Sequence, residues 1–380
     1  MTIILFDTPQ SRKSFYPFTL TRAVCNIRYG ILTIKEKWEH QTGLPVAALT
    51  EDYLQQPVDN HDVYLYIDAT INPTKKLLDA VTALAIDSSI TYNGQPIAIK
   101  SKTLLPYPVV VEKKFQQIPV STIDAIKFSW QLFQTNEQAI RSDFKLVTKD
   151  RACQPIDNSN VIFGKENIFI EQGATVRACI INAEEGPVYI GKNALVMEGT
   201  MIRGPVAICN NAVVKMGSKL YAGTTIGPYC TAGGEIKNSI LIGYSNKAHD
   251  GYLGDSVIGE WCNLGAGTSN SNIKNTAGTV KMWSGAENNY VEVGTKAGLL
   301  MGDYSRTAIN TSFNTGTVVG TCCNIFTNGF PPKHIPSFTW GNNKYDIEKA
   351  TADLSRWMKL KGKDLGEAEE KMIKHLYSLE

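Results

Sequence analysis

The sequence predicts a two-domain protein in which an α/β domain precedes a parallel β-helix. The first observation behind this fold class is that short apolar segments alternate with amphipathic ones up to about residue 145, which is typical of strands alternating with helices. The second is an aliphatic residue at every sixth position later in the chain, beginning at Ile190. A length of 380 residues also favours two domains over one.

Composition narrows the class of protein. Hydrophobic residues make up 43% of the chain and charged residues 19%, which is too apolar for a disordered protein. The net charge of +2 gives no strong attraction to nucleic acid. No stretch of 18 apolar residues predicts a membrane span. The first ten residues lack a basic segment followed by an apolar one, and the eight cysteines form no C-x-x-C. We therefore expect a cytoplasmic enzyme with reduced cysteines.

The N-terminal segment is interpreted as a mostly parallel sheet with connecting helices. Strands are expected at Thr2–Phe6, Val46–Leu49, Val63–Ile67 and Ile97–Lys100. Helices are expected at Gly30–Glu39, Lys75–Leu84 and Ile123–Ile140.

A period of six residues matches neither a helix nor a simple strand. It fits a coil of roughly 18 residues, in which three short strands each point one aliphatic side chain into the core. This predicts a β-helix from Ile162 to Ile325. The aliphatic series is Ile190, Val196, Ile202, Ile208, Val214, Leu220 and Ile226, with Ala232 after it and Ile170 and Val176 before it. The phase returns at Ile242, Ile258 and Leu264, and a looser series follows at Met301, Thr307, Phe313, Val319 and Ile325.

Two further segments depart from the repeat. Asn270–Asn289 is polar and Gly-rich, so we expect a loop that leaves the coil. After Pro331-Pro332, the amphipathic segments Tyr345–Trp357 and Gly366–Tyr377 predict helices that cover the last coil or pack on a partner chain. The predicted domains are 1–145, 146–330 and a helical extension at 331–380.

His249 is the candidate catalytic residue. It is the only histidine within the repeats, and it lies in K-A-H-D-G-Y-L-G-D, where the six-residue phase slips. Glu235 and Lys237 lie 14 and 12 residues before it, so stacking of coils should bring both near it as candidate substrate-binding residues. Histidine is suited to general base catalysis because its free pKa lies near working pH. The alternative is a purely structural histidine.

The run Ser245–Asp255 has the form S-x-x-x-H-x-x-Y-L-G-D, and Asn263–Thr268 follows as N-L-G-A-G-T. Both resemble the acetyltransferase domain of the bacterial bifunctional N-acetylglucosamine-1-phosphate uridyltransferases / glucosamine-1-phosphate acetyltransferases. The resemblance implies a left-handed β-helix, a homotrimer with sites between chains, acetyl-CoA as cosubstrate and His249 as the general base. It also implies a set of substrate-binding residues, namely Lys219, Lys237, Tyr252, Asn263 and Asn272.

The chain departs from this family in two places. Lys219 stands where the family has an arginine, and Lys cannot form the bidentate fork that Arg makes with phosphate. Ile273 stands where the family has a tyrosine, which removes that contact. By resemblance, acetyl-CoA would lie along the later coils, with its phosphates met by Lys296, Arg306 and Lys333.

Plainer interpretations of the same residues stay open. Lys219 and Lys237 could be ordinary solvated side chains. Asn263 and Asn272 could be corner residues, because Asn tolerates the left-handed conformation of a tight bend.

The N-terminal domain lacks the loop that sugar nucleotidyltransferases place after the first strand, which resembles L-A-A-G-x-G-T-R. Here the chain reads Leu5-Phe6-Asp7-Thr8-Pro9, with no glycine before Gly30. The following segment resembles the nucleotidyltransferase-like domain of a divergent branch of the same enzymes. That resemblance implies a nucleotide site with Arg12, Lys13 and Arg22, and a Mg²⁺-binding Asp68. For Asp68, the alternative is a cap preceding Asn72-Pro73.

These patterns lead to one main hypothesis. The β-helix would acetylate glucosamine-1-phosphate, and the N-terminal domain would join N-acetylglucosamine-1-phosphate to UTP with Mg²⁺. One alternative is a sugar-phosphate nucleotidyltransferase whose β-helix serves only oligomerisation or regulation. Another is a catalytically inactive scaffold. Small-molecule sugar phosphates and nucleotides are the expected partners, and neither nucleic acid nor a membrane is expected.

Overall fold

The computed structural model describes residues 1–109 and 116–380. These residues form two compact units. Unit 1 consists of Met1–Phe15, Thr21–Ile27 and Leu32–Phe128, and unit 2 consists of Tyr16–Leu20, Arg28–Ile31 and Ser129–Glu380. The predicted boundaries at residues 145 and 330 remain an interpretation, because compactness of the backbone does not test which segments fold independently.

Unit 1 is built on one mixed sheet with the strand order β2-β1-β3-β5-β4-β6. Strand β1 pairs in parallel with β2 and β3, whereas β5 pairs antiparallel with β3 and β4. The prediction of a mostly parallel sheet missed the β4–β5 hairpin. Asn93 and Gly94 both have positive φ at its turn, as a two-residue hairpin requires. The strands are β1 (Thr2–Phe6), β2 (Val46–Leu49), β3 (Tyr64–Asp68), β4 (Ser88–Tyr92), β5 (Gln95–Ser101) and β6 (Gln116–Pro119).

The α-helices of unit 1 each begin at a side-chain cap, supplied by Thr8, Thr33 and Thr74. The helix expected from Gly30 begins at Ile34, because Thr33 Oγ1 accepts from the Glu36 amide and the Thr33 amide donates to the Glu36 carboxylate. Unit 1 contains α1 (Pro9–Ser14), the short 3-10 turn η2 (Val24–Asn26), α2 (Ile34–Thr42) and α3 (Lys75–Thr82). In unit 2, η1 (Phe18–Leu20) precedes α4 (Gln131–Thr148), which begins eight residues after the predicted Ile123.

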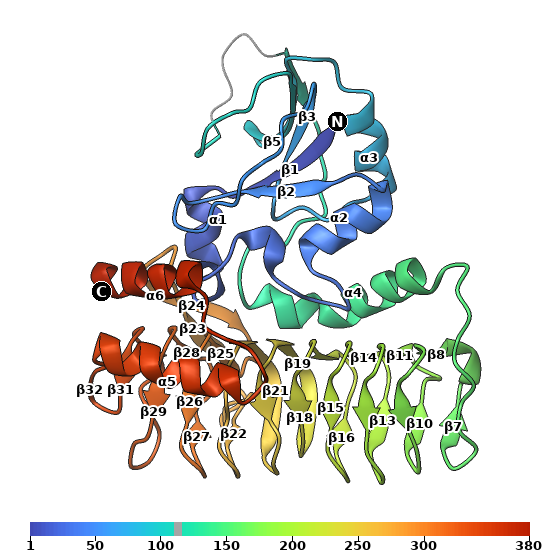
Figure 1. Cartoon of the computed structure of the whole chain (residues 1–380), viewed down its shortest axis with the longest axis vertical. Helices are drawn as coiled ribbons and strands as arrows, with labels where there is room; N and C mark the ends of the chain where they lie inside the picture. Colours follow the sequence, from blue (N-terminus) through green and yellow to red (C-terminus); the bar gives the residue numbers. More distant parts are fainter. Residues whose placement is uncertain (110–115) are drawn as a thin grey trace. The chain divides into compact units, whose positions relative to one another are not determined.

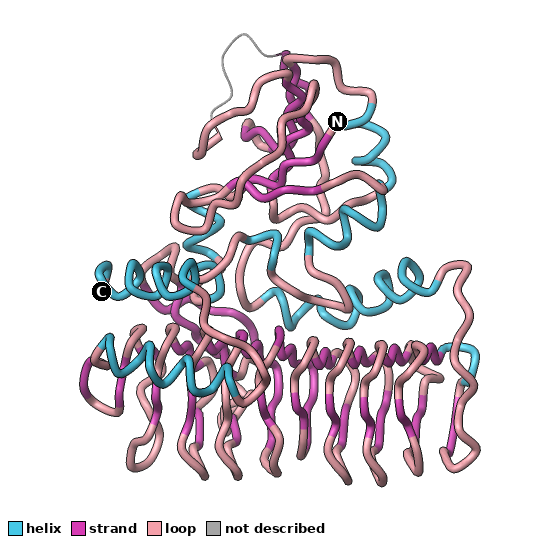
Figure 2. Tube along the Cα trace, in the orientation of Figure 1, coloured by secondary structure: helices cyan, strands magenta, loops and turns pink. Residues whose placement is uncertain are grey.

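Unit 2 is a parallel β-helix whose coils follow one another in chain order (Figures 1 and 2). The strands fall on three faces. The first face carries β7 (Val161–Phe163), β10 (Ile180–Asn182), β13 (Met201–Arg203) and β16 (Lys219–Leu220). The second face carries β8 (Ile168–Ile170), β11 (Val188–Ile190), β14 (Val206–Ile208), β17 (Thr224–Ile226), β25 (Leu299–Met301), β28 (Thr317–Val319) and β30 (His334–Ile335).

Two long strands, β19 (Glu235–Gly243) and β21 (Tyr252–Glu260), pass from the first face to the second without a break. The third face carries β9 (Thr175–Val176), β12 (Leu195–Val196), β15 (Val213–Val214), β18 (Thr231–Ala232), β20 (Asn246–Lys247), β26 (Arg306–Thr307), β29 (Asn324–Ile325), β31 (Thr339–Trp340) and β32 (Asn343–Lys344). A separate pair, β22 (Ser269–Asn270) and β27 (Ser312–Phe313), also stacks in parallel. A short 3-10 turn, η3 (Lys165–Asn167), joins β7 to β8.

The six-residue repeat is confirmed by the core of this β-helix. Every aliphatic from Ile190 to Ala232 in the predicted series is buried in one cluster. The prediction that Ile242 continues the core series was wrong, because Leu241 pairs with Ile226 and takes the core position. The chain advances only 15 residues there, against 18 between Ile208 and Ile226. One column of the second face therefore reads Ile170, Ile190, Ile208, Ile226, Leu241, Ile258, Met301, Val319 and Ile335.

The predicted excursion contains an antiparallel hairpin of β23 (Val280–Ser284) and β24 (Asn289–Gly294). Trp283 of this hairpin stacks on His334 with ring centroids 4.3 Å apart, which ties the excursion to a later coil. The two predicted C-terminal helices are present as α5 (Ile347–Lys359) and α6 (Glu367–Leu379). Trp357 of α5 covers Arg306, so this helix packs on the third face.

Within the two described ranges, no helix is both long enough and apolar enough to cross a membrane.

The core column predicts that truncating an inward apolar residue lowers the free energy of unfolding much more than truncating an outward one. Ile208→Ala should lower the free energy of unfolding by about 2–5 kcal/mol, because it removes buried methyl groups and leaves a cavity. Met216, which is 71% exposed, is the matched control, and Met216→Ala should change stability by no more than about 0.5 kcal/mol. Urea unfolding of both variants measures the difference, and equal losses would contradict the assigned register.

Candidate functional site

The predicted substrate-binding residues of the β-helix line up because strands of the first face pair in parallel register. Lys219 pairs with Glu235, and Glu235 pairs with Tyr252. Lys219 is exposed while the next residue, Leu220, lies in the core, so these positions point outward. Lys237 belongs to the same strand as Glu235, two residues on, and is also exposed. The structure therefore brings Lys219, Glu235, Lys237 and Tyr252 together on one face.

Tyr252 belongs to a side-chain network that sequence reasoning found only in part. Asn272 Nδ2 donates to the Tyr252 hydroxyl at 3.1 Å and to Asp255 Oδ2 at 2.5 Å. Asn238 Nδ2 donates to the other Asp255 oxygen at 2.7 Å. Asp255 and Asn238 were not predicted, although Asp255 closes the Y-L-G-D motif. The network fixes the start of the excursion, at Asn272, against the first face.

Burial raises the pKa of Tyr252 to about 12, with the Asp255 and Glu235 carboxylates acting in the same direction. The phenol therefore keeps its proton at neutral pH. It can accept from Asn272 and still offer its own proton to a ligand.

His249 lies at an exposed bend between β20 and β21. Among the residues that the structure describes, its ring has no hydrogen-bond partner, so both nitrogens are open to a ligand. The bend itself is held by main-chain bonds, because Gly267 N donates to Asp250 O at 3.1 Å. This bend leads directly into Tyr252, so the candidate base sits at the edge of the first face.

Asn263 lies on the third face rather than in the first-face array. It pairs with Asn246, whose Nδ2 donates to Asn263 Oδ1 at 3.3 Å. Asn263 therefore lies across the His249 corner from Tyr252, and its predicted role stays a prediction.

The three residues predicted for acetyl-CoA have different surroundings. Lys296 is exposed at the end of the excursion, where it pairs with Ile273. Lys333 is half-buried, and both burial and the nearby Lys274 lower its pKa. Arg306 is buried, with its guanidinium 5.1 Å from the centre of the Trp357 ring. A phosphate in solvent cannot reach Arg306 beneath α5, which removes it from the candidate coenzyme site.

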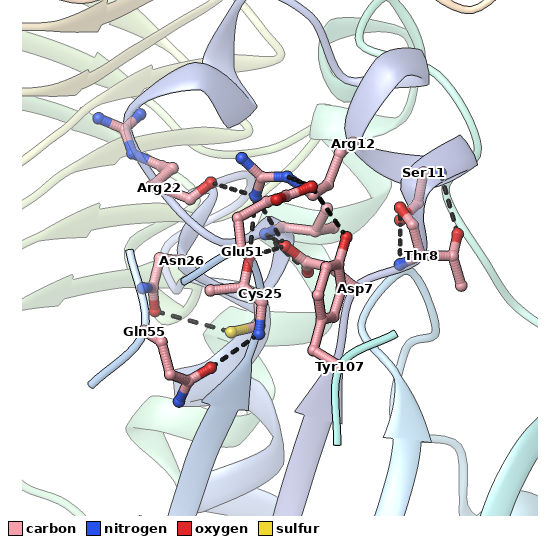
Figure 3. Close-up of polar contacts among 12 residues, drawn as sticks. Asp7, Thr8, Ser11, Arg12, Arg22, Cys25, Asn26, Glu51, Gln55 and Tyr107 are labelled. Carbon is pink, nitrogen blue, oxygen red and sulfur yellow. Dashed lines mark hydrogen bonds and ion pairs between the residues drawn. The ribbon is translucent and has the colours of Figure 1, made fainter. Parts of the chain in front are cut away.

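In unit 1, the strand end that would face a nucleotide is filled by the chain's own carboxylate (Figure 3). Arg12 Nη1 donates to Asp7 Oδ2 at 3.0 Å and to Thr50 Oγ1 at 2.8 Å. Thr50 Oγ1 in turn donates to Asp7 at 2.6 Å, and the Val24 amide donates to Asp7 at 3.1 Å. Arg12 Nη2 also donates to the Tyr53 hydroxyl. This cluster was not predicted, although Asp7 directly follows a buried strand.

The other predicted nucleotide-binding residues are not gathered around one pocket in the same way. Lys13 is exposed on α1, whereas the Arg22 side chain is buried and its carbonyl accepts from Arg12 at 3.4 Å. Of the three predicted nucleotide-binding residues, Lys13 alone is exposed to solvent.

Asp68 ends β3, as predicted, and its Oδ1 accepts from the Thr70 amide at 2.9 Å and the Thr70 hydroxyl at 2.7 Å. These bonds close a local turn, and the predicted helix cap is wrong, because the N-cap of α3 is Thr74. Burial raises the pKa of Asp68. Across residues 1–109 and 116–380, no three His, Cys, Asp or Glu side chains gather as a metal-binding group. A Mg²⁺ ion at Asp68 would thus take its other ligands from water and from nucleotide phosphates.

The chain was compared with protein-family models and with curated proteins, and both comparisons found matches. Residues 3–152 match the family model described as sugar nucleotidyl transferase. The chain is 38% identical over 89 residues to the bifunctional protein GlmU of Methanocaldococcus jannaschii, covering 23% of this chain and 21% of that protein. It is 33% identical over 106 residues to the bifunctional protein GlmU of Thermodesulfovibrio yellowstonii, covering 23% of this chain and 24% of that protein. The chain thus spans about a quarter of the length of these relatives.

Solved structures give weaker matches. The acetyltransferase domain of PglB from Neisseria gonorrhoeae is 11% identical, covers 87% of this chain and 96% of its own, and gives a TM-score of 0.17. PerB from Caulobacter crescentus, in complex with CoA and GDP-perosamine, is 10% identical, covers 90% and 93%, and gives 0.15.

The Asp7 cluster predicts a structural role for Arg12. Arg12→Ala should lower the stability of unit 1 by about 3–5 kcal/mol, because it leaves the Asp7 carboxylate buried without its partner. Lys13→Ala, one residue away on an exposed side chain, should change stability by less than about 0.5 kcal/mol. Thermal unfolding of the two variants compares them. An Arg12→Ala protein as stable as Lys13→Ala would show that the cluster is dispensable and would return Arg12 to the nucleotide site.

Proposed function

We propose that the β-helix transfers an acetyl group from acetyl-CoA to the amine of an amino-sugar phosphate, with glucosamine-1-phosphate as the substrate. The observation that carries this proposal is the open His249 ring at the edge of a face that presents Lys219, Glu235, Lys237 and Tyr252. These residues supply a base for the amine, two cations for the phosphate, and a carboxylate and a phenol that can hydrogen-bond sugar hydroxyls.

The proposed reaction is an acyl transfer with one proton abstraction. The substrate amine attacks the thioester carbonyl while the His249 imidazole takes a proton from the amine nitrogen. The carbon–sulfur bond breaks, and the leaving thiolate takes the proton from the His249 imidazolium, so coenzyme A leaves as its thiol and the base is restored. Lys219 and Lys237 hold the sugar phosphate, and Tyr252, Asn272, Asn263 and Glu235 orient the sugar. Lys296 and Lys333 are proposed contacts of the coenzyme phosphates.

We further propose that the active assembly is a homotrimer. Next to the site, the first face carries a stripe of exposed apolar side chains at Val161, Phe163, Ile180 and Met201. An exposed apolar stripe of this kind is typical of an interface, and its continuity with the Lys219–Tyr252 array favours sites shared between copies of this chain.

For unit 1, we propose uridylyl transfer from UTP to N-acetylglucosamine-1-phosphate, supported by the family match over residues 3–152. Lys13 would contact the nucleotide phosphates and Asp68 would hold Mg²⁺, which would neutralise phosphate charge. Arg12, which the resemblance assigned to the nucleotide, forms an ion pair with Asp7 and is therefore left out of the proposed nucleotide contacts.

A second candidate function is a nucleotidyltransferase whose β-helix only assembles the oligomer. The exposed apolar stripe is the observation that favours it. It differs from the main proposal in requiring no acetyl-CoA.

The role of His249 gives a direct prediction. His249→Ala should lower kcat for acetyl transfer roughly 10²–10⁴-fold, because it removes the general base. Its melting temperature should stay at the wild-type value, since the ring is exposed and has no partner among the described residues. His40 on α2 is also exposed, and His40→Ala is the matched control. Free thiol release measures both, and a His249→Ala protein within twofold of wild type would remove histidine from the mechanism.

The two reactions can be separated in one assay. Glucosamine-1-phosphate with acetyl-CoA should release thiol, and N-acetylglucosamine-1-phosphate with UTP and Mg²⁺ should release pyrophosphate. His249→Ala should lose the first activity and keep the second. Pyrophosphate release without any thiol release from the wild-type protein would favour the second candidate function instead.

A further inference from the structure

A lysine occupies a core position of the β-helix directly before the His249 bend. Lys247 pairs with Ala232, Ala232 pairs with Val214, and Val214 pairs with Val196, so these four residues form one inward-facing column of the third face. Lys247 is 1% exposed and is among the largest fully buried side chains of the chain. A lysine in an aliphatic column is costly, because its ammonium loses hydration. Such a residue calls for a compensating function.

Other coils show what the corner between the third and first faces normally requires. Thr200 Oγ1 donates to Met197 O at 2.8 Å and to Lys215 O at 3.2 Å. Ser218 Oγ donates to Lys215 O at 2.6 Å. In each case, a buried hydroxyl just before the first-face strand satisfies carbonyl groups of the corner.

The next two coils have no hydroxyl at this position. Register places Gly234 and Gly251 where the earlier coils have Thr200 and Ser218. Gly251, which lies in the His249 corner, has a φ of +125°, and a Cβ added to it would lie 2.2 Å from Thr268 O. The corner that carries His249 is therefore too tight for the serine or threonine used elsewhere.

The Lys247 ammonium fills this gap. Its Nζ donates to Gly233 O at 3.4 Å and makes a shorter hydrogen bond to His249 O. Gly233 occupies the register position of Lys215, so the ammonium serves the same carbonyl that Ser218 serves one coil earlier. The second bond reaches the backbone of the candidate base itself.

We propose that Lys247 is a positioning residue that holds the backbone of the His249 bend in its catalytic place by donating to the corner carbonyls. This inference rests on the proposed acetyl transfer. Lys247 does not touch the substrate, because its side chain is enclosed by the coil. It acts through His249, whose ring direction depends on the bend.

The buried Lys247 ammonium lowers the free energy of unfolding while it holds the backbone of the bend. Burial lowers the pKa of Lys247 to about 8, against which the Asp250 carboxylate acts to raise it. Asp250 belongs to the bend, and the neighbouring coils present apolar Ala232 and Leu264 in register with Lys247. Because the unfolded lysine holds its proton up to a higher pH, the ammonium destabilises the fold below pH 8, and this penalty shrinks as pH rises from about 8 towards 10.5.

The test is Lys247→Met in the full-length chain, because methionine fills a similar apolar volume without a donor. We expect kcat for acetyl transfer to fall at least tenfold with KM for glucosamine-1-phosphate within threefold of wild type. The melting temperature at pH 7 should equal or exceed that of wild type, and this gain should shrink by pH 10. Hydrogen exchange should accelerate in peptides that cover residues 248–251. Lys215→Met, an exposed lysine at the neighbouring corner, is the control and should match wild type in every readout.

Three outcomes would overturn the inference. Lys247→Met could retain kcat within twofold, could lose kcat only together with its melting temperature as expected of a merely structural residue, or could leave exchange at 248–251 unchanged. The failure of the proposed function has a different signature, because wild type and His249→Ala would then give the same thiol release. In that case, hydrogen exchange and the melting temperatures still decide whether Lys247 holds the bend.

Discussion

Parallel stacking of successive coils in register is the constraint on which the rest of unit 2 depends. Each coil must place its inward aliphatic over that of the coil before, as Ile208 and Ile226 do. The same register fixes the outward positions, so Lys219, Glu235 and Tyr252 fall in line on one face without any requirement of their own. Core packing therefore also sets the positions of the site residues, and a change of register would disrupt both the core and the site.

Changes in coil length explain where the site lies. The coil from Ile226 to Leu241 is shortened, and the excursion after Asn270 lengthens a later one. The His249 bend and β21 lie between these two irregularities, and the Asp255 network joins Asn238 in the shortened coil to Asn272 in the excursion. Two regular coils satisfy carbonyls of the corner between the third and first faces with the hydroxyls of Thr200 and Ser218. The next two corners have Gly234, Gly251 and the buried Lys247 instead.

The sequence predicted the β-helix well because each coil repeats a physical requirement, namely one buried aliphatic per strand. It failed at Ile242, because a fixed period cannot reveal that a coil is shortened. The same shortening moves Lys247 into the core, which no reading of its charge would suggest. Arg306 was predicted to contact phosphate because the sequence alone does not show that Trp357, on a helix much later in the chain, covers its guanidinium. In unit 1, the Asn93-Gly94 turn could have been read as a hairpin, whereas the pairing of Asp7 with Arg12 and Thr50 depends on tertiary packing.

The central claim is that the first face beside His249 binds an amino-sugar phosphate. A crystal structure of the full chain with glucosamine-1-phosphate and coenzyme A tests it most directly. The account predicts the sugar nitrogen within hydrogen-bonding distance of the His249 ring and the sugar phosphate against Lys219 or Lys237. Sugar phosphate bound away from this face, with His249 facing only solvent, would contradict it.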